Sequence, residues 1–151
     1  MTRPFASVIL TAFTLLLSYG PARAVMVFVS ASEELSSINE KIEDLSAGDS
    51  LVFRPGVYKG PFIVKGIHGA PNQPIVLMGI SDISGLTTID GQSQPGTGLK
   101  NNAFQMESCS WIVLEGFSIR RCWPDIITSI NVSYLSVKQC DVKGGKRLLY
   151  A

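Results

Sequence analysis

Two neighbouring segments of this chain match one another, at a spacing of about 23 residues, which is within the range of solenoid repeats. Residues 110–120 align with residues 133–143, so that aromatic Trp111 falls on aromatic Tyr134 and the aliphatic and basic positions coincide as well. Apolar runs that recur about every 20–29 residues are typical of solenoids, in which each turn of the chain covers the apolar face of the turn before it. The repeat therefore restricts the fold more than any other feature of the sequence, and it predicts a long, flat or grooved surface.

The repeat extends one period towards the N-terminus, where Ile89 falls on Ile112 and Leu135. We expect these three side chains to stack along one axis inside the core. Strands are expected at short apolar runs bounded by Gly, Pro and Asn, namely residues 26–29, 51–53, 62–64, 75–77, 87–89, 104–106, 111–114, 117–119, 126–128, 135–137 and 140–142. A sandwich of antiparallel hairpins is the main alternative, but it would not require a fixed register. The sequence therefore predicts an all-β fold, a right-handed parallel β-helix of about four coils.

A single helix is expected over residues 32–46. Ser32 stands at the N-cap position, and Gly48 follows at the C′ position that favours a left-handed backbone. The apolar residues recur every three or four positions and so share one helical face: Leu35, Ile38, Ile42 and Leu45. Because an open solenoid end exposes apolar core and an unpaired strand edge to water, we interpret this helix as an N-terminal cap.

Residues 1–24 have the pattern of a signal peptide. A cationic start at Arg3 precedes an apolar run over residues 5–17, and residues 22–24 form the A-x-A pattern of a signal peptidase site. A transmembrane anchor is the alternative, but about 13 apolar residues are short against the roughly 20 that a spanning helix needs. The sequence thus predicts residues 1–24 as a cleaved signal peptide, residues 25–151 as one β-helix domain, and a secreted protein that is extracellular or periplasmic.

Composition and cysteine count add bounds on function. A net charge of +1 argues against nucleic-acid binding, which needs clustered basic charge. The chain has three cysteines, an odd number, so at least one is left unpaired within the chain. The spacing does not decide whether Cys109 and Cys122 form a disulfide. Cys140 is in register with Phe117, so we expect a buried thiol that acts as a small apolar side chain. His68 is the lone histidine and is expected to be a loop residue rather than a metal ligand.

Several stretches of the chain carry a family resemblance. Residues 47–58, 69–75 and 88–91 resemble the amino-terminal part of pectin-lyase-like right-handed parallel β-helix proteins, and residues 110–120 resemble their next coil. Within that superfamily the chain is most similar to the alginate lyase and chondroitinase B group. The likeness covers most of residues 47–143. It implies the β-helix fold more specifically than any activity, because one fold hosts many functions.

The resemblance implies the amino-terminal part of a polysaccharide lyase-like enzyme that acts on an acidic polysaccharide. In those lyases the catalytic Lys and Arg and the calcium-binding carboxylates lie in later coils. The catalytic residues of this chain are therefore unknown, calcium is implied only for such later coils, and the chain alone is expected to be inactive. The sequence shows no cap after residue 143, which favours a domain truncated at its C-terminus; the alternative is a short protein that associates end to end through its uncapped last coil.

Two register pairs are candidates for substrate binding on the outward face: Trp111 with Tyr134, and Arg120 with Lys143. Aromatic rings offer a surface for the apolar face of a sugar, and two stacked cations attract an anionic partner. The alternatives are packing beneath a loop or against a missing C-terminal part for the aromatic pair, and a nearby acid or plain solvation for the cationic pair. We expect the four residues to form one outward strip. No D-x-D cluster is present, so no metal site is expected here.

Two classes of function follow. The first is a carbohydrate-active enzyme that cleaves an acidic polysaccharide by β-elimination, which needs a group to neutralise the uronate carboxylate, a base and an acid. The alternative is a non-catalytic, secreted β-helix protein that serves in surface adhesion or glycan binding. The expected partner is an acidic polysaccharide in both cases, without nucleic acid and without a membrane span after signal cleavage.

Overall fold

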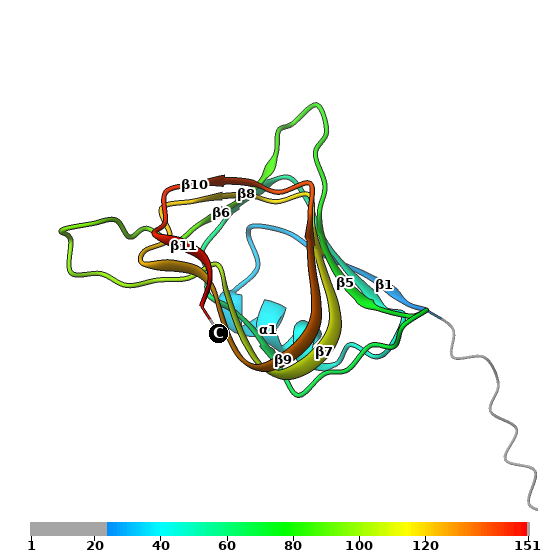
Figure 1. Ribbon diagram of the computed structural model, residues 1–151. Helices are drawn as coiled ribbons and strands as arrows, with labels where there is room; N and C mark the ends of the chain where they lie inside the picture. Colours follow the sequence, from blue (N-terminus) through cyan, green and yellow to red (C-terminus); the bar gives the residue numbers. More distant parts are fainter. Residues whose placement is uncertain (1–23, 151) are drawn as a thin grey trace, which may run out of the picture.

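The computed structural model describes residues 24–150, in which the named strands pair in parallel and form two sheets. The first sheet has the order β1-β2-β5-β7-β9-β11, with β4 also paired to β7, and the second has the order β10-β8-β6-β3. The strands are β1 (Met26–Val29), β2 (Ser50–Phe53), β3 (Gly56–Tyr58), β4 (Phe62–Lys65), β5 (Ile75–Gly79), β6 (Thr87–Asp90), β7 (Phe104–Glu115), β8 (Ser118–Arg120), β9 (Asp125–Lys138), β10 (Asp141–Lys143) and β11 (Arg147–Tyr150). Figure 1 looks along the direction of stacking and shows the strands of successive turns overlapping.

The register of the sequence repeat is confirmed for the last two turns of the chain. Ile112 in β7 pairs with Leu135 in β9, and Ile119 in β8 pairs with Val142 in β10. Strands β7 and β9 each join two expected strands into one, whereas β3 and β11 had no counterpart among the expected strands.

The prediction for Ile89 was wrong. Ile89 belongs to β6 in the second sheet and pairs with Ile119, which lies more than one repeat further along the chain. The place beside Ile112 is taken by Ile75 of β5. The loop over residues 91–101 lengthens this turn, so the fixed spacing of the last two turns does not extend back to β6.

Strands β7 and β9 bend at residues with a left-handed backbone. These residues are Ser108, Trp111, Asn131 and Tyr134, with φ between 49° and 56°. Ser108 and Asn131 are separated by one repeat, and so are Trp111 and Tyr134. The chain therefore bends at equivalent positions in both turns, and each strand continues around a corner of the molecule (Figure 1).

Aromatic rings fill the centre of the core. The ring of Phe53 meets Tyr58, Phe62 and Phe117 edge-on, at centroid distances between 5.1 and 5.3 Å. Such edge-to-face contacts add to the stabilisation that comes from apolar burial. They join β2, β3 and β4 to the segment that enters β8.

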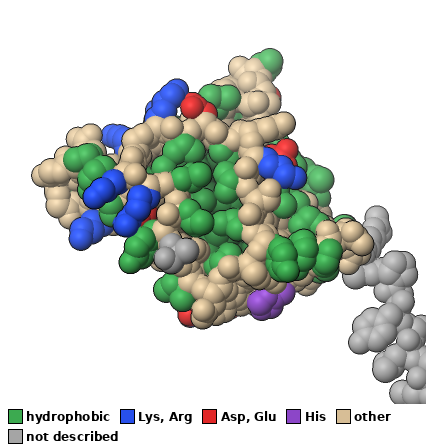
Figure 2. Space-filling model, viewed as in Figure 1, with side chains coloured by type: hydrophobic (Ala, Val, Ile, Leu, Met, Phe, Trp, Pro, Cys, Tyr) green, Lys and Arg blue, Asp and Glu red, His purple; other side chains and the backbone are tan. Residues whose placement is uncertain are grey.

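The apolar side chains of the last turn are less buried than those of the turn before it. Ile112 and Leu114 are fully buried, whereas their register partners Leu135 and Val137 are half-buried and 36% exposed. Apolar side chains accordingly occupy the middle of the face in Figure 2.

The helix α1 (Leu35–Glu43) is shorter than expected at both ends. Glu34 rather than Ser32 occupies the N-cap, and it makes no side-chain cap. The helix ends at Asp44, so Gly48, with φ +92°, belongs to the turn that follows and not to the helix C-terminus.

The apolar face of α1 is as expected. Ile38 and Ile42 are buried in the same core as the strands, together with Leu45 just after the helix. Asn39 accepts a hydrogen bond at its Oδ1 from the backbone N–H of Ile63 at 3.0 Å, so one side chain of the helix satisfies a donor on the edge of β4.

The three cysteines are free. Cys109 and Cys122 are buried and Cys140 is half-buried against the core, so the expected Cys140 thiol is more exposed than predicted. Burial raises the pKa of both Cys109 and Cys122 to about 11, which leaves these thiols protonated and unreactive near neutral pH. Between residues 24 and 150, no helix is long and apolar enough to cross a membrane. The predicted signal peptide lies outside the described residues except for Ala24.

Candidate functional site

The four predicted site residues form two separate pairs. Trp111 and Tyr134 lie at the bend within β7 and β9, in the first sheet. Arg120 and Lys143 lie at the C-terminal ends of β8 and β10, in the second sheet, and are register partners. The pairs therefore occupy different corners, and the single strip expected from the sequence is not formed.

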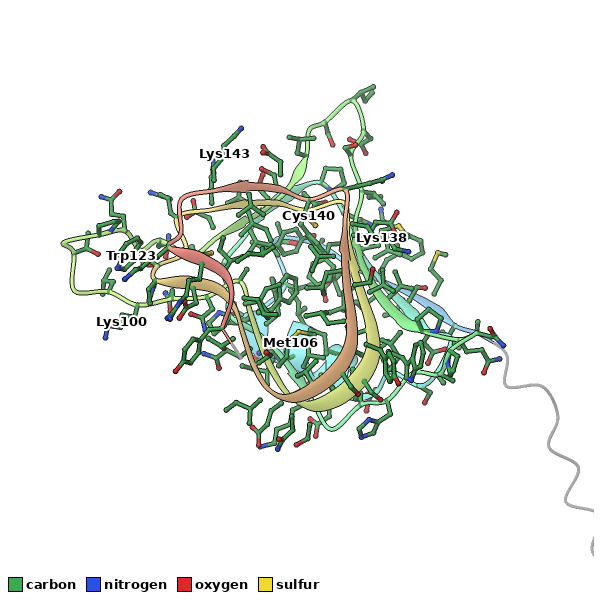
Figure 3. The ribbon with its side chains drawn as sticks, in the orientation of Figure 1. Lys100, Met106, Trp123, Lys138, Cys140 and Lys143 are labelled. Carbon is green, nitrogen blue, oxygen red and sulfur yellow. The ribbon has the colours of Figure 1, made fainter. Side chains whose placement is uncertain are left out.

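A groove of about 400 Å³ lies beside Arg120 and Lys143, which we call the basic groove. One wall comes from the start of the loop over residues 91–101, and the other from the ends of β8 and β10. Its lining residues are Ser93, Gln94, Pro95, Arg120, Arg121, Cys122, Trp123, Lys143 and Gly144. Figure 3 shows Lys143, Trp123 and Lys100 on the same side of the molecule, away from Lys138.

A buried carboxylate organises the cations of the basic groove. Asp90 ends β6, and its side chain is 4% exposed. The guanidinium of Arg121 donates to both carboxylate oxygens, with Nε 2.8 Å from Oδ1. Arg120 Nε lies 3.3 Å from Oδ2, and the backbone N–H of Gln92 donates to Oδ1 at 3.0 Å.

These contacts determine the charge of the groove. The hydrogen bond from Arg121 holds the pKa of Asp90 below its usual range, against the opposing effect of burial. On the neighbouring strand Lys143 pairs with Asp141 at 2.9 Å in solvent. Three cations thus face two carboxylates, and the basic groove keeps a net positive charge.

The wall of the groove is fixed to the strand ends by hydrogen bonds. Asn101 and Trp123 exchange two backbone hydrogen bonds, each of 3.0 Å. The buried Ser93 hydroxyl accepts from the backbone N–H of Trp123 at 2.9 Å and donates to the carbonyl of Arg121. The groove is therefore formed in advance of any ligand, which lowers the cost of ordering its side chains on binding.

The other pair forms an aromatic corner. The rings of Trp111 and Tyr134 stack at 3.9 Å with an interplanar angle of 10°. They line a hollow of about 310 Å³ with Pro71, Pro74, Val113, Leu135 and Ser136.

Trp111 and Tyr134 both have a left-handed backbone conformation, which glycine adopts more readily than they do. The φ angles of Trp111 and Tyr134 are 56° and 55°, a conformation that costs a bulky residue about 1–3 kcal/mol. Ring stacking offsets about 0.5–1.5 kcal/mol of this cost.

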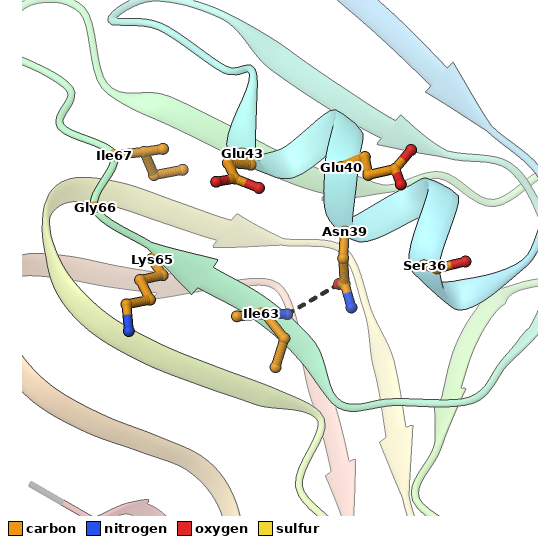
Figure 4. A pocket seen from close by; sticks show the side chains of 8 residues that line it. All are labelled: Ser36, Asn39, Glu40, Glu43, Ile63, Lys65, Gly66 and Ile67. Carbon is orange, nitrogen blue, oxygen red and sulfur yellow. Dashed lines mark hydrogen bonds between the residues drawn. The ribbon is translucent and has the colours of Figure 1, made fainter.

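Another hollow, of about 620 Å³, contains none of the predicted site residues. It lies between α1 and β4 and is lined by Ser36, Asn39, Glu40, Glu43, Ile63, Lys65, Gly66 and Ile67. Figure 4 shows Asn39 reaching across it to Ile63. Glu40 and Glu43 outnumber Lys65 in the lining, and Lys65 also pairs with Glu107 of β7 at 2.9 Å, so this hollow does not suit an anionic ligand.

The described residues offer no calcium site of the kind the family resemblance implies for later coils. No group of three or more His, Cys, Asp or Glu between residues 24 and 150 is arranged to hold a metal ion. Asp90 is bound by Arg121, and Asp125 receives two hydrogen bonds from Arg147, at 2.6 and 3.0 Å. These carboxylates are already neutralised by guanidinium groups and do not fit a divalent cation.

Two of the nine residues that line the basic groove, Arg120 and Lys143, were predicted from the sequence. Arg121 directly follows Arg120 at the end of β8, and this pair of arginines was a visible signal. Gln94 and Trp123 gave no signal, because only the fold brings the loop over residues 91–101 against Trp123.

Comparisons with known proteins identify the fold. The chain matches no protein-family model and no curated protein sequence. Among solved structures it is similar to an alginate lyase from Paenibacillus sp. str. FPU-7, with a TM-score of 0.60 and 14% identity over 78% of this chain. It is also similar to the PL6 family alginate lyase AlyGC, with a TM-score of 0.55 and 13% identity over 78% of this chain.

The chain spans 36% of the first of these enzymes and 15% of the second. At such identities the likeness shows the fold alone, a β-helix of the polysaccharide lyase type built of parallel strands. The sequence resemblance to alginate lyases is thereby confirmed at the level of fold. The resemblance to chondroitinase B and to the wider pectin-lyase-like superfamily stays a prediction.

Proposed function

We propose that this chain is an exported, carbohydrate-active β-helix protein that binds an acidic polysaccharide at the basic groove. The observation that carries the proposal is the cluster of Arg120, Arg121 and Lys143 along one groove, with both arginines held by the buried carboxylate of Asp90, on a fold shared with two alginate lyases. Guanidinium groups present paired N–H donors that match a uronate carboxylate. Arg121 is engaged by Asp90 through two hydrogen bonds, whereas Arg120 makes one longer contact with Asp90 and Lys143 makes one exposed ion pair with Asp141. We therefore assign Arg120 and Lys143 as the cations that face the ligand.

The finer architecture belongs to the same proposal. We infer a right-handed parallel solenoid whose first turn is covered by α1. Two contacts support the capping role: Ile38 and Ile42 close the core, and Asn39 occupies the edge donor of Ile63. A cap of this kind protects a strand edge that would otherwise pair with another chain.

The activity of the whole protein is proposed to be that of a polysaccharide lyase, acting by β-elimination. Such a reaction requires a free base and a free acid near the substrate carboxylate. Asp90 is held in its ionised form by Arg121 and is enclosed, so it does not supply either group. The residues of this chain therefore bind and orient an anionic sugar, and we expect no cleavage by the chain alone.

Export is proposed on the sequence pattern of residues 1–24. Expression with the natural N-terminus, followed by mass spectrometry of the released protein, tests it directly. A product that begins at Val25 supports the assignment, and an intact N-terminus in the released protein opposes it.

The binding proposal is tested with the full chain and four polymers. Alginate, polygalacturonate and chondroitin sulfate are compared with a neutral glucan by isothermal titration calorimetry. We expect the acidic polymers to bind and the affinity to fall as salt is added, because exposed charges are screened over about 8–10 Å. Equal binding of the neutral glucan, or no binding of any acidic polymer, would contradict the proposal.

The same samples test whether these coils cleave an acidic polymer. Ultraviolet absorbance of unsaturated products is followed during incubation with each acidic polymer. Binding without products is the result expected for this chain and also suits a non-catalytic adhesion or glycan-binding protein. Appearance of products would contradict the expected lack of cleavage and would assign lyase activity to these coils.

A further inference from the structure

We infer that the hollow between α1 and β4 is a docking site for an extended, basic peptide segment of a partner protein, which adds as a strand to the edge of β4. The inference goes beyond the proposed function, because this hollow takes a cationic partner, whereas the basic groove takes an anion. It rests on an unpaired stretch of strand edge and on the charge of the lining.

The helix covers the edge of β4 only in part. The backbone N–H groups of Phe62 and Gly66 donate to carbonyls of β7 and of the residue just before it. Alternate residues of a strand point their backbone groups to the same side, so those of Ile63 and Lys65 point away from β7, where α1 and the hollow lie. Asn39 occupies the N–H of Ile63, but no described residue makes a hydrogen bond to the backbone of Lys65. Lys65 therefore offers the donor and the acceptor that an added strand uses.

The end of this edge is open to an incoming chain. A lysine on an edge discourages pairing when its charge is free. Here the ammonium of Lys65 is bound by Glu107 of β7 at 2.9 Å, and Figure 4 shows the side chain directed away from α1. The chain then turns at Gly66, where an added Cβ would meet no atom within 4 Å apart from the neighbouring residues.

The lining favours a basic partner. Glu40 and Glu43 of α1 are exposed, line the hollow and make no ion pair with another described residue. Ile63 and Ile67 add an apolar surface, which suits the aliphatic stems of Lys and Arg side chains. An extended peptide with basic residues at alternate positions matches both the strand edge and the two carboxylates.

The first arm of the test measures the charge requirement. The full chain is titrated by calorimetry with the end-blocked hexapeptide Lys-Val-Lys-Val-Lys-Val. We expect binding to the wild type and an affinity at least about fivefold weaker for Glu40→Gln/Glu43→Gln, because two ion pairs are lost. Glu34→Gln/Asp44→Asn is the matched control, since it removes the same charge from exposed positions at the two ends of α1 that do not line the hollow. Its affinity is expected to stay within about twofold of the wild type.

The second arm measures the strand pairing. The same hexapeptide with methylated backbone nitrogens keeps its charges but cannot donate to a strand edge, so we expect binding at least about tenfold weaker. Hydrogen exchange of the Lys65 amide, followed by NMR, is expected to slow when the unmethylated peptide is bound. Lys65→Pro removes the N–H that points away from β7 without removing a bond between β4 and β7, and it is expected to weaken binding. Lys65→Gln keeps this N–H and is expected to bind no more weakly than the wild type.

Absence of binding between the hexapeptide and the wild type overturns the inference. Equal binding by Glu40→Gln/Glu43→Gln, or equal binding of the acidic hexapeptide Glu-Val-Glu-Val-Glu-Val, overturns it as well, because the lining would then not select a basic chain. Equal binding of the methylated peptide, with unchanged exchange at Lys65, also overturns it, because attraction between charges alone would then explain the affinity.

Discussion

Arg121 turns its guanidinium back to the carboxylate of Asp90 on the preceding turn of the chain, with Nε 2.8 Å from Oδ1. The contact ties the end of β8 to the end of β6, and the pairing of β10 with β8 places Lys143 beside Arg120 at the border of the same groove. The carboxylate is buried and ionised, so it fixes the cations without cancelling all of their charge.

The contact predicts an acid-dependent part of stability. The pKa of Asp90 is depressed by the hydrogen bond from Arg121, so its contribution is present above the ordinary aspartate pKa of about 3.9 and is lost as the pH falls below that value. Urea unfolding of the wild type and of Asp90→Asn at several pH values measures it. We expect the difference in unfolding free energy between the wild type and Asp90→Asn to shrink as the pH is lowered from about 5. A constant difference across this range would show that Asp90 is not held ionised by the fold.

A second prediction concerns the inward and outward faces of β7. Leu114 is fully buried, whereas its neighbour Glu115 is only half-buried. Leu114→Ala is expected to lower the unfolding free energy by about 2–5 kcal/mol, because it leaves a cavity in the core. Glu115→Gln is expected to change it by about 0.5 kcal/mol or less. Chemical denaturation of both variants decides the matter, and equal losses would contradict the assignment of faces.

The corner between β7 and β8 gives a third prediction. Gly116 has φ +74°, and a Cβ there would lie 2.2 Å from the carbonyl oxygen of Gly79. Gly116→Ala is therefore expected to destabilise the fold by more than about 1 kcal/mol, through both strain and collision. Gln139 occupies the equivalent corner in the last turn with φ 49°, so Gln139→Gly is expected to be neutral or stabilising. A neutral Gly116→Ala variant would refute this close contact of the two turns.

Much of the fold was predictable from the sequence, because local patterns carry it. The apolar runs marked most strands, and the spacing of the repeat predicted the pairing of Ile112 with Leu135. The same spacing failed at Ile89, where a longer loop changes the length of the turn. Strands recur at a fixed spacing only where successive turns contain the same number of residues. The apolar pattern of the sequence does not show how long each loop is.

The candidate site was less predictable, because it depends on which turns meet. Arg120 and Lys143 share a register and were found as a pair. The carboxylate that holds Arg120 and Arg121, Asp90, lies on another turn, and the sequence repeat did not indicate this contact. Sequence alternation also placed Trp111 and Arg120 on one strip, although the bend at Gly116 carries them to different sheets.

The partly covered last turn predicts self-association. Val137 is the register partner of the buried Leu114 and is 36% exposed. Among the described residues, β11 pairs with β9 only between Asp125 and Thr128, so the edge of β9 beside Val137 is unpaired. Unpaired edges and exposed apolar core favour association, and a lysine there opposes it. We expect the apparent mass in size-exclusion chromatography with light scattering to rise with protein concentration, and Val137→Lys to suppress the rise.

The control for this prediction is Val57→Lys. Val57 is 51% exposed on β3, at a distance along the stack from the last turn. Val57→Lys should leave the rise of the apparent mass with concentration unchanged. Circular dichroism checks that both variants fold. A monomeric wild type at all concentrations would contradict the prediction.

The most direct measurement of the central claim is the affinity of alginate for a charge-neutralised groove. Arg120→Gln/Lys143→Gln removes the two cations that face the ligand, and Lys65→Gln/Lys138→Gln removes the same charge elsewhere on the surface. The account predicts that the first variant loses at least about tenfold in affinity and much of the salt dependence, while the control changes by less than about threefold. Equal losses in the two variants, or undiminished binding by the first, would contradict the basic groove as the site of an acidic polysaccharide.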